Sequence, residues 1–240
     1  MSPPWGVSVE SWVCLGAPQP SDGHSPVQNM TRLYLIRHAE TSWNRDNRIQ
    51  GGSDVPLSPF GLQQAARLGG LFAARHLQAI VSSPMQRSRQ TAEAIITGNG
   101  HGLDPQIEAE LAEMHLGAWE GLTPEEVDAR FENAYQQWRH SPSMVRIPEA
   151  EPLEQFRARV RRIFERLLER ATEGEWVVVS HGGVIAAMLA EVLDADYDAL
   201  LRRLRLDNAG VTALECGPGR PPHVLWINGT THLTEFSTGQ

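Results

Sequence analysis

Four basic residues follow apolar segments of this chain and could together bind and attack an anion. Arg37 and His38 come directly after the apolar run LYLI. Arg87 lies one helical turn beyond the apolar segment 78–82, and His181 follows the run WVVVS. Guanidinium groups bind phosphate oxygens, and an imidazole can serve as a nucleophile or as a base. These residue types therefore indicate chemistry on a phosphorylated substrate.

The positions of these residues predict that they meet at one edge of a sheet. In open α/β sheets, ligands bind outside the carboxyl ends of the strands, and the segments 31–36, 78–82 and 176–180 are typical of buried strands. A helix begins at Gly182, and helix N-termini attract phosphate. Because burying unpaired guanidinium groups is costly, we expect an anion between the arginines.

The rest of the chain alternates between strand-like and helix-like patterns. Helices are expected at 59–75, from Pro84 to about 96, at 153–171 and from 182, and further strands at 210–215 and 223–227. The middle, 110–150, is irregular, with helical pieces after Thr123 and over 131–139. This alternation predicts an α/β three-layer sandwich, with a mostly parallel central sheet and helices on both faces.

The nature of the nucleophile follows from what the sequence lacks. A metal phosphatase would need carboxylates grouped with its histidines, and HxH and HxxxH spacings are absent at His38 and His181. A cysteine phosphatase would need a CxxxxxR loop, which neither Cys14 nor Cys216 begins. An imidazole remains to take the phosphoryl group covalently. We therefore expect no metal and no cofactor.

A leaving alkoxide must also gain a proton, and the segment 110–121 carries three carboxylates that could donate it. They are Glu110, Glu113 and Glu120. A carboxyl group beside a bound phosphate dianion favours its protonated form, which suits a general acid near neutral pH. Spacing alone does not choose among the three.

Composition narrows the class of protein. All 21 basic residues are Arg, which excludes lysine chemistry, and the net charge of -8 argues against a nucleic-acid partner. The apolar runs are shorter than the roughly 18 residues of a membrane span. With two cysteines we expect a cytoplasmic protein. Residues 1–29 are proline-rich and aperiodic, which predicts a flexible N-terminal extension before a domain over 30–240.

A series of ordered motifs resembles those of the histidine phosphatase superfamily, whose fold is phosphoglycerate mutase-like. The resemblance extends from Thr31 to about Phe236. The family patterns RH[GA]ETxxN, RxQG, DxPL[ST]xxG, SSxxxRxxQTA, ExxxGxWEG and SHGG are matched in order at 37–44, 48–51, 54–61, 82–92, 113–121 and 180–183.

This resemblance implies a role for each matched residue. His38 is implied to be the phosphorylated nucleophile and Glu113 the proton donor, without a metal. The residues implied to bind or assist the phosphoryl group are Arg37, Arg87, His181, Asn44, Gln50, Gly51 and Gly182. The loop PEAEP at 148–152 departs from the family pattern PxGES, which leaves its part in binding open.

The resemblance also implies a substrate class and its alternatives. Glu113 precedes His181 by 68 residues (181 minus 113), which resembles the short phosphatase branch: broad-specificity, α-ribazole-phosphate and phosphoserine phosphatases that act on small phosphorylated metabolites. A cofactor-dependent phosphoglycerate mutase is the alternative, although that branch carries a longer insertion. A catalytically silent protein-binding module is a second alternative, against which retention of the nucleophile and the acid argues.

Three further expectations concern the surroundings of the site. The tail 227–236 resembles that of phosphoserine phosphatases, in which a late histidine closes over the site, but His232 is better interpreted as a packed terminal residue. An edge strand at 223–227 leaves a homodimer open. Side chains that could wall the pocket are Trp43, Met114, His115, Trp119, Tyr135 and Trp138.

Overall fold

A six-stranded sheet forms the centre of the structure, a computed structural model that describes residues 30–237. The strand order is β3-β2-β4-β1-β5-β6. The strands are β1 (Thr31–Arg37), β2 (Leu77–Ser82), β3 (Gln106–Ile107), β4 (Gly174–Ser180), β5 (Val211–Gly217) and β6 (Arg220–Gly229). The first four strands pair in parallel, whereas β5 is antiparallel to β1 and β6 to β5. The expected mostly parallel sheet is confirmed, and the extension expected at 1–29 lies outside the described residues.

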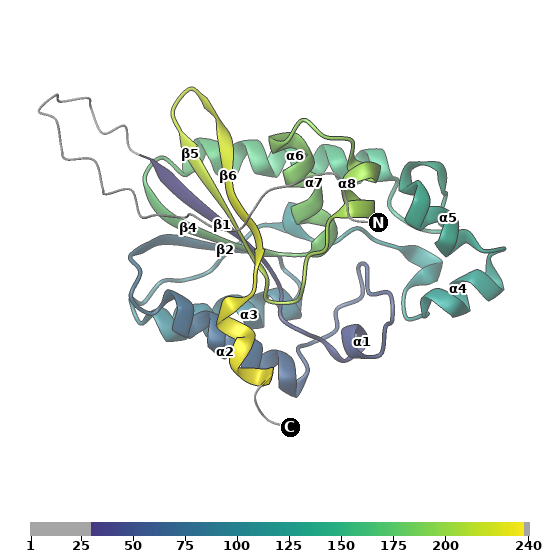
Figure 1. Ribbon diagram of the computed structural model, residues 1–240, viewed down its shortest axis with the longest axis horizontal. Coiled ribbons are helices and arrows are strands. Elements are labelled where there is room, and N and C mark those ends of the chain that lie inside the picture. Colours follow the sequence, from purple (N-terminus) through teal and green to yellow (C-terminus); the bar gives the residue numbers. More distant parts are fainter. Residues whose placement is uncertain (1–29, 238–240) are drawn as a thin grey trace, which may run out of the picture.

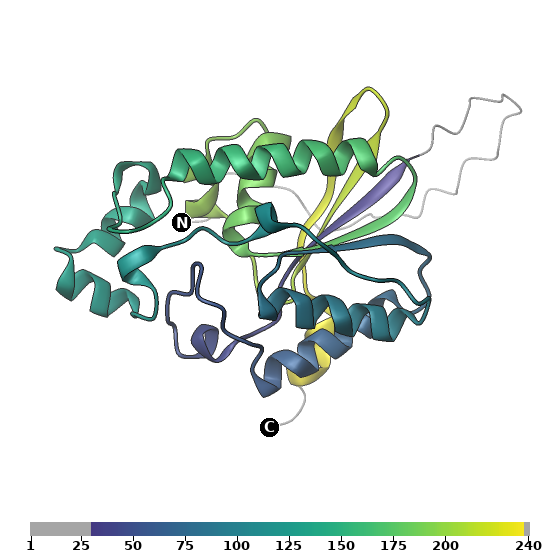
Figure 2. The ribbon, with the colours of Figure 1, turned by 180° about the vertical axis from the view of Figure 1, so that it is seen from behind.

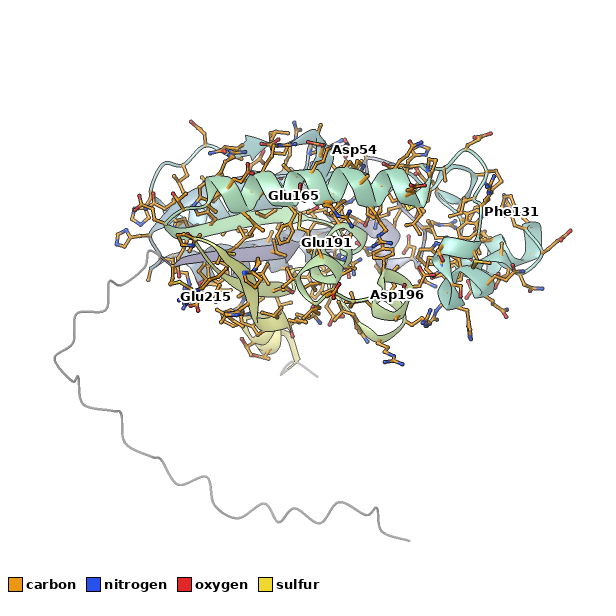
Figure 3. The ribbon with its side chains drawn as sticks, turned by 90° about the horizontal axis from the view of Figure 1, so that it is seen from above. Asp54, Phe131, Glu165, Glu191, Asp196 and Glu215 are labelled. Atoms are coloured by element: carbon orange, nitrogen blue, oxygen red, sulfur yellow. The ribbon has the colours of Figure 1, made fainter. Side chains whose placement is uncertain are left out.

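Helices cover both faces of this sheet, which confirms the three-layer architecture (Figure 1). One face carries α2 (Pro59–Phe72) and α3 (Gln86–Asn99), and the other carries α6 (Leu153–Arg170), α7 (Gly182–Val192) and α8 (Tyr197–Arg203). Viewed from above, α6 runs along the sheet beside α7 (Figure 3). Arg161 of α6 and Glu191 of α7 form an ion pair with 2.9 Å between Nη2 and Oε1.

Alternating side chains of the central strands divide the core into two clusters. Successive residues of a strand point to opposite faces. Leu33 and Leu35 of β1 accordingly pack under α6 and α7, whereas Tyr34 and Ile36 pack against α2 and α3. The run Val177–Val179 of β4 is buried on both faces, which explains its continuous apolar pattern.

Local sequence signals place the helix limits only to within a few residues. Ser58 caps α2 by accepting from the backbone N–H of Gly61, as expected. The expectation that α2 reaches residue 75 is wrong, because the helix ends at Phe72. The next helix begins at Gln86 rather than Pro84 and runs on to Asn99, where Gly100 takes a left-handed conformation.

The middle of the chain forms short helices at one end of the molecule (Figure 2). They are α4 (Pro124–Arg130) and α5 (Ala134–His140). The helical piece expected over 131–139 begins only at Ala134, because Glu132 and Asn133 have positive φ angles that are incompatible with a right-handed helix. The short α1 (Ser42–Arg45) and α8 were not expected. Within the described residues, no helix is long and apolar enough to cross a membrane.

Candidate active site

Three neighbouring strands bring the predicted residues to one edge of the sheet. β4 lies between β1 and β2 and is parallel to both, so their carboxyl ends meet. The rings of His38 and His181 lie 5.2 Å apart between centroids. Nε of Arg87 donates to Nδ1 of His181 over 3.3 Å. The expected convergence is therefore present, while the roles of these residues remain predictions.

A backbone carbonyl holds the ring of His38, which is 3% exposed. Nδ1 lies 2.7 Å from the carbonyl oxygen of Ala39. Because that oxygen can only accept a hydrogen bond, Nδ1 carries the proton. Burial lowers the pKa of His38 well below its ordinary value, and the charges of Arg87 and Arg37 lower it further. The imidazole is therefore neutral near pH 7, and Nε2 has a lone pair free for attack.

Backbone carbonyls hold the guanidinium group of Arg87, which is 1% exposed. Nη1 donates to the carbonyl of Ser53 over 2.7 Å, and Nη2 to that of Gly51 over 2.9 Å. Burial lowers the pKa of Arg87 to about 10, so the group remains charged near pH 7. Within the described part of the chain, no carboxylate forms an ion pair with it. A buried cation in this state favours the binding of an anion.

One N–H donor of the Arg37 guanidinium group has no hydrogen-bond partner among the described residues. Nη1 donates to the carbonyl of Leu206, whereas Nε is buried and has no hydrogen-bond partner among residues 30–237. A Cβ atom placed on Gly182 would lie 3.8 Å from this Nε, so the donor lies close to the N-terminus of α7. Burial lowers the pKa of Arg37. A phosphate oxygen bound between Arg37 and the helix N-terminus would satisfy the donor.

His181 lies behind the other residues and is fully buried. Its Nδ1 accepts from Arg87, and its Nε2 lies 2.8 Å from the hydroxyl oxygen of Ser83. Burial lowers the pKa of His181 well below its ordinary value, and the charge of Arg87 lowers it further. With both ring nitrogens engaged, His181 braces Arg87 in this structure. Its contact with a phosphoryl oxygen stays a prediction.

The three candidate acids lie in different surroundings. Oε2 of Glu113 accepts from the N–H of Gly183 over 3.1 Å, and Oε1 accepts from that of Met114 over 2.9 Å. Glu110 instead forms ion pairs with arginines of α6, and Glu120 accepts from the N–H of Gly52 and the hydroxyl of Ser53. Of the three, Glu113 alone lines the cavity that contains His38. The geometry thus supports Glu113 as the donor.

The smaller predicted contributors line the same cavity. The side-chain oxygens of Asn44 and Gln50 both accept hydrogen bonds from Thr41. Their amide N–H groups are therefore the ones available to a ligand. Gly51 has a φ of +50°, which favours glycine, and Gly182 is the first residue of α7.

Two polar residues that the sequence analysis missed support the site. Nδ2 of Asn208 donates to the carbonyl of His38 and to Oδ1 of Asn44, both over 3.1 Å. Arg159 of α6 donates to the carbonyls of Glu110, Ala112 and Glu113. These contacts span from 46 to 170 residues of sequence, so no local pattern could have revealed them.

The divergent loop 148–152 also has a structural role. Glu151 binds Arg159 through two hydrogen bonds, of 2.7 and 2.8 Å. The N–H of Glu151 donates to the carbonyl of His115 over 2.9 Å, and the N–H of Ala118 to that of Pro148 over 3.0 Å. The loop therefore supports the segment that carries the candidate acid.

Apart from His181, the residues predicted to bind the phosphoryl group line a cavity of about 470 Å³. Four of the six expected wall residues line it: Met114, Trp119, Tyr135 and Trp138. Trp43 and His115 do not. His232 is also outside the lining, and the 3₁₀ helix Thr231–Ser237 packs against α2, which agrees with a packed terminal residue. Nowhere within 30–237 do three His, Cys, Asp or Glu side chains form a group that could hold a metal.

The family profile that matches this chain is that of the histidine phosphatase superfamily (branch 1), over residues 33–229. Among curated proteins, the chain is 32% identical over 207 residues to phosphoserine phosphatase 1 of Hydrogenobacter thermophilus, which covers 86% of this chain and 96% of that protein. It is 33% identical to a probable phosphoglycerate mutase GpmB of Citrobacter koseri, over 78% of this chain and 85% of that protein. It is also 34% identical to a 2-carboxy-D-arabinitol-1-phosphatase of Triticum aestivum over 83% of this chain, which spans only 40% of the wheat protein.

Solved structures share both the fold and part of the sequence. YhfR of Bacillus stearothermophilus has a TM-score of 0.77 and 33% identity, covering 85% of this chain and 99% of that one. A mycobacterial glucosyl-3-phosphoglycerate phosphatase has a TM-score of 0.74 and 28% identity, covering 84% of this chain and 100% of that one.

Proposed function

Because this chain belongs to the histidine phosphatase superfamily, we infer that it is a phosphomonoesterase acting on a small phosphorylated metabolite, with His38 as its nucleophile. The observation that carries the inference is the state of His38. Its imidazole is buried and neutral, its Nδ1–H is held by Ala39, and its free Nε2 lies in a cavity that also contains two guanidinium groups. This is the arrangement that nucleophilic attack on phosphorus requires.

In the first step, Nε2 of His38 forms a bond to phosphorus while the ester P–O bond breaks. The electron pair of that bond passes to the leaving oxygen, and Glu113 donates a proton to it. Arg37, Arg87 and the N-terminus of α7 neutralise the charge of the remaining phosphoryl oxygens, which is most of what phosphoryl transfer requires of a protein.

In the second step, water releases the phosphoryl group from His38. Glu113 is now the carboxylate and takes a proton from the attacking water, while the P–N bond breaks and its electron pair returns to Nε2. Inorganic phosphate leaves, and both residues regain their starting protonation states.

The phosphohistidine intermediate provides the test. The protein is mixed with a ³²P-labelled phosphomonoester and the reaction is stopped rapidly without acid. The protein should then carry a ³²P label that is lost in acid and stable in alkali. The label and turnover should both disappear in His38→Gln and persist in His140→Gln, which changes an exposed histidine of α5. Turnover in His38→Gln equal to that of the wild type would overturn the proposal.

The phosphoglycerate mutase alternative is supported by several relatives named probable phosphoglycerate mutase GpmB and is tested separately. The protein is given 3-phosphoglycerate with and without 2,3-bisphosphoglycerate, and both products are followed. We expect release of inorganic phosphate to exceed isomerisation. Isomerisation that outruns phosphate release would identify a mutase that uses the same nucleophile.

We further propose a cytoplasmic location, on the grounds that Cys216 is a free, buried thiol whose pKa burial raises to about 11.

A homodimer remains a prediction. The edge strand β6 exposes Leu225 and Trp226, each 40% accessible, and light scattering of the purified protein would measure the mass.

A further inference from the structure

The cavity above the phosphate-binding residues has outer walls of a different chemical character. Arg37, Arg87 and Glu113 line it beside His38, whereas most of the other lining residues, apart from Asn47 and Arg48, are apolar or aromatic. A volume of about 470 Å³ lies within the roughly 300–1,000 Å³ of pockets that hold ligands of several rings or a long chain. The outer part, here called the chamber, is defined by Met114, Trp119, Tyr135, Trp138, Leu201 and Leu204.

Aromatic rings form one wall of the chamber. The rings of Tyr135 and Trp138 stack with 5.9 Å between centroids and an interplanar angle of 25°. Trp119 lies 6.2 Å from Tyr135 and 6.4 Å from Trp138 between centroids. Leu201 of α8 also lines the chamber. Such walls favour an apolar or aromatic group over a hydrated polar one.

Among the described residues, none of the six that define the chamber is a cation that could receive a carboxylate. Apart from Arg37 and Arg87 beside His38, Arg48 is the remaining cation that the structure places in the cavity lining. Its Nη1 donates to the carbonyl of Gly121 over 2.6 Å and lies 3.2 Å from Oε2 of Glu126. A substrate carboxylate would have to share this guanidinium group with Glu126.

We propose that the preferred substrate is a phosphomonoester of an apolar or aromatic alcohol large enough to fill the chamber, rather than of a short carboxylated alcohol such as serine or glycerate. This inference rests on the proposed phosphatase function and names its substrate class. The chamber binds the leaving group through apolar contact, while the inner residues bind the phosphoryl group that every substrate shares.

A series of alkyl phosphates tests the proposal, because the reactivity of the leaving alkoxide changes little along it. We expect kcat/KM to rise from methyl to hexyl phosphate by up to about fourfold per methylene group, the equivalent of about 0.8 kcal/mol. 2-Phenylethyl phosphate should exceed phosphoserine and 3-phosphoglycerate by about 100-fold or more.

Each outcome has a distinct meaning. If phosphoserine or 3-phosphoglycerate is hydrolysed faster than 2-phenylethyl phosphate, the chamber proposal is wrong and the phosphatase function stands. If none of the esters is hydrolysed and no phosphohistidine forms, the proposed function itself fails.

Variants of the aromatic wall provide an internal control. Trp138→Ala should lower kcat/KM for 2-phenylethyl phosphate at least fivefold while changing that for methyl phosphate less than twofold, and Trp138→Phe should restore most of the loss. A misfolded variant would lose both activities together, so the ratio reports on the chamber. Gln137→Ala, an exposed neighbour on the same helix, should leave the ratio unchanged. A ratio unaltered in Trp138→Ala would overturn the proposal.

Discussion

The carbonyl oxygen of Ala39 lies 2.7 Å from Nδ1 of His38 and can only accept a hydrogen bond. It therefore keeps the ring proton on Nδ1 and leaves Nε2 unprotonated, where a second proton is opposed by burial and by two arginines. The same two arginines that would bind the phosphoryl group thus also keep the nucleophile neutral. This double use of charge explains why arginine stands beside histidine at the end of β1.

The proposed acid makes a prediction about leaving groups. Glu113→Gln should lower kcat/KM for an alkyl phosphate by about 10²–10⁴-fold, because the leaving alkoxide then receives no proton. It should lower kcat/KM for 4-nitrophenyl phosphate far less, since nitrophenolate departs without a proton. Steady-state assays of both esters give the ratio. The control is Glu110→Gln, a change in the same segment that removes an ion pair with Arg166 of α6. It should leave the ratio of the two activities unchanged. Equal losses for both esters in Glu113→Gln would count against the acid role.

The sequence alone predicted the residues grouped around His38. It did not predict the residues that hold them in place. His38, Arg87 and His181 follow apolar strands, and that local signal suffices to place them at one edge of a parallel sheet. Asn208 and Arg159 have no comparable signal. Their partners are backbone carbonyls that become neighbours only when distant segments pack, so residue type and spacing say nothing of them.

At the scale of elements, α6 positions the irregular segment that carries Glu113. Arg159 of this helix, whose side chain is 15% exposed, donates to three carbonyls of that segment. Arg159→Gln should leave these carbonyls partly unsatisfied, costing about 1–3 kcal/mol of stability. Because the acid would then be misplaced, kcat/KM for an alkyl phosphate should fall about tenfold relative to 4-nitrophenyl phosphate.

A matched variant separates this positioning role from a general loss of stability. Arg162→Gln changes a mostly exposed arginine of the same helix, which contacts Glu110 at the surface. The ratio of the two activities should stay at the wild-type value in this control. If Arg159→Gln loses stability but keeps the wild-type ratio, Arg159 does not position the acid.

The contact between α2 and α3 depends on one of two adjacent glycines. A Cβ atom on Gly69 would lie 2.6 Å from the carbonyl oxygen of Ala94, whereas one on Gly70 would meet nothing within 4 Å. Gly69→Ala should therefore destabilise the protein by about 1–3 kcal/mol through overpacking. Gly70→Ala should stabilise it by about 0.5–1 kcal/mol, because alanine favours the helix. Urea unfolding would measure both, and similar effects of the two changes would contradict the structure.

Element types were more predictable than element limits. The long helices and every strand except the two-residue β3 were expected from the sequence pattern, and β4 was expected from its continuous apolar run. The start of α5 and the separate α8 follow Asn133 and Asp194, whose φ angles are positive although neither residue is glycine. Local propensity gives little warning of such turns.

For the whole molecule, the buried histidines predict a loss of stability in mild acid. The folded-state pKa values of His38 and His181 lie well below the unfolded value of 6.5. Between these values the unfolded chain binds protons that the folded protein does not, so stability is full above about pH 6.5 and decreases as the pH falls. Each histidine contributes a slope of up to about 1.4 kcal/mol per pH unit.

Urea unfolding between pH 7.5 and 5.5, in phosphate-free buffer, would measure this slope. Phosphate is left out because a ligand that binds only the folded state adds its own stabilisation. His181→Gln should make the slope shallower, whereas His140→Gln, at an exposed position, should not. A wild-type stability that stays constant over this range would show that the buried histidines are not held neutral.

The place of β4 in the sheet has a consequence for how the chain is made. β1 and β2 are synthesised early, yet the strand that lies between them begins only at Gly174. On the ribosome, therefore, both early strands wait with unpaired edges and apolar side chains such as Leu35 and Ile80 exposed to solvent. We expect a nascent chain that stalls before β4 to expose these apolar side chains, and turnover to begin only after β4 and the residues that follow it, such as His181, have joined the fold.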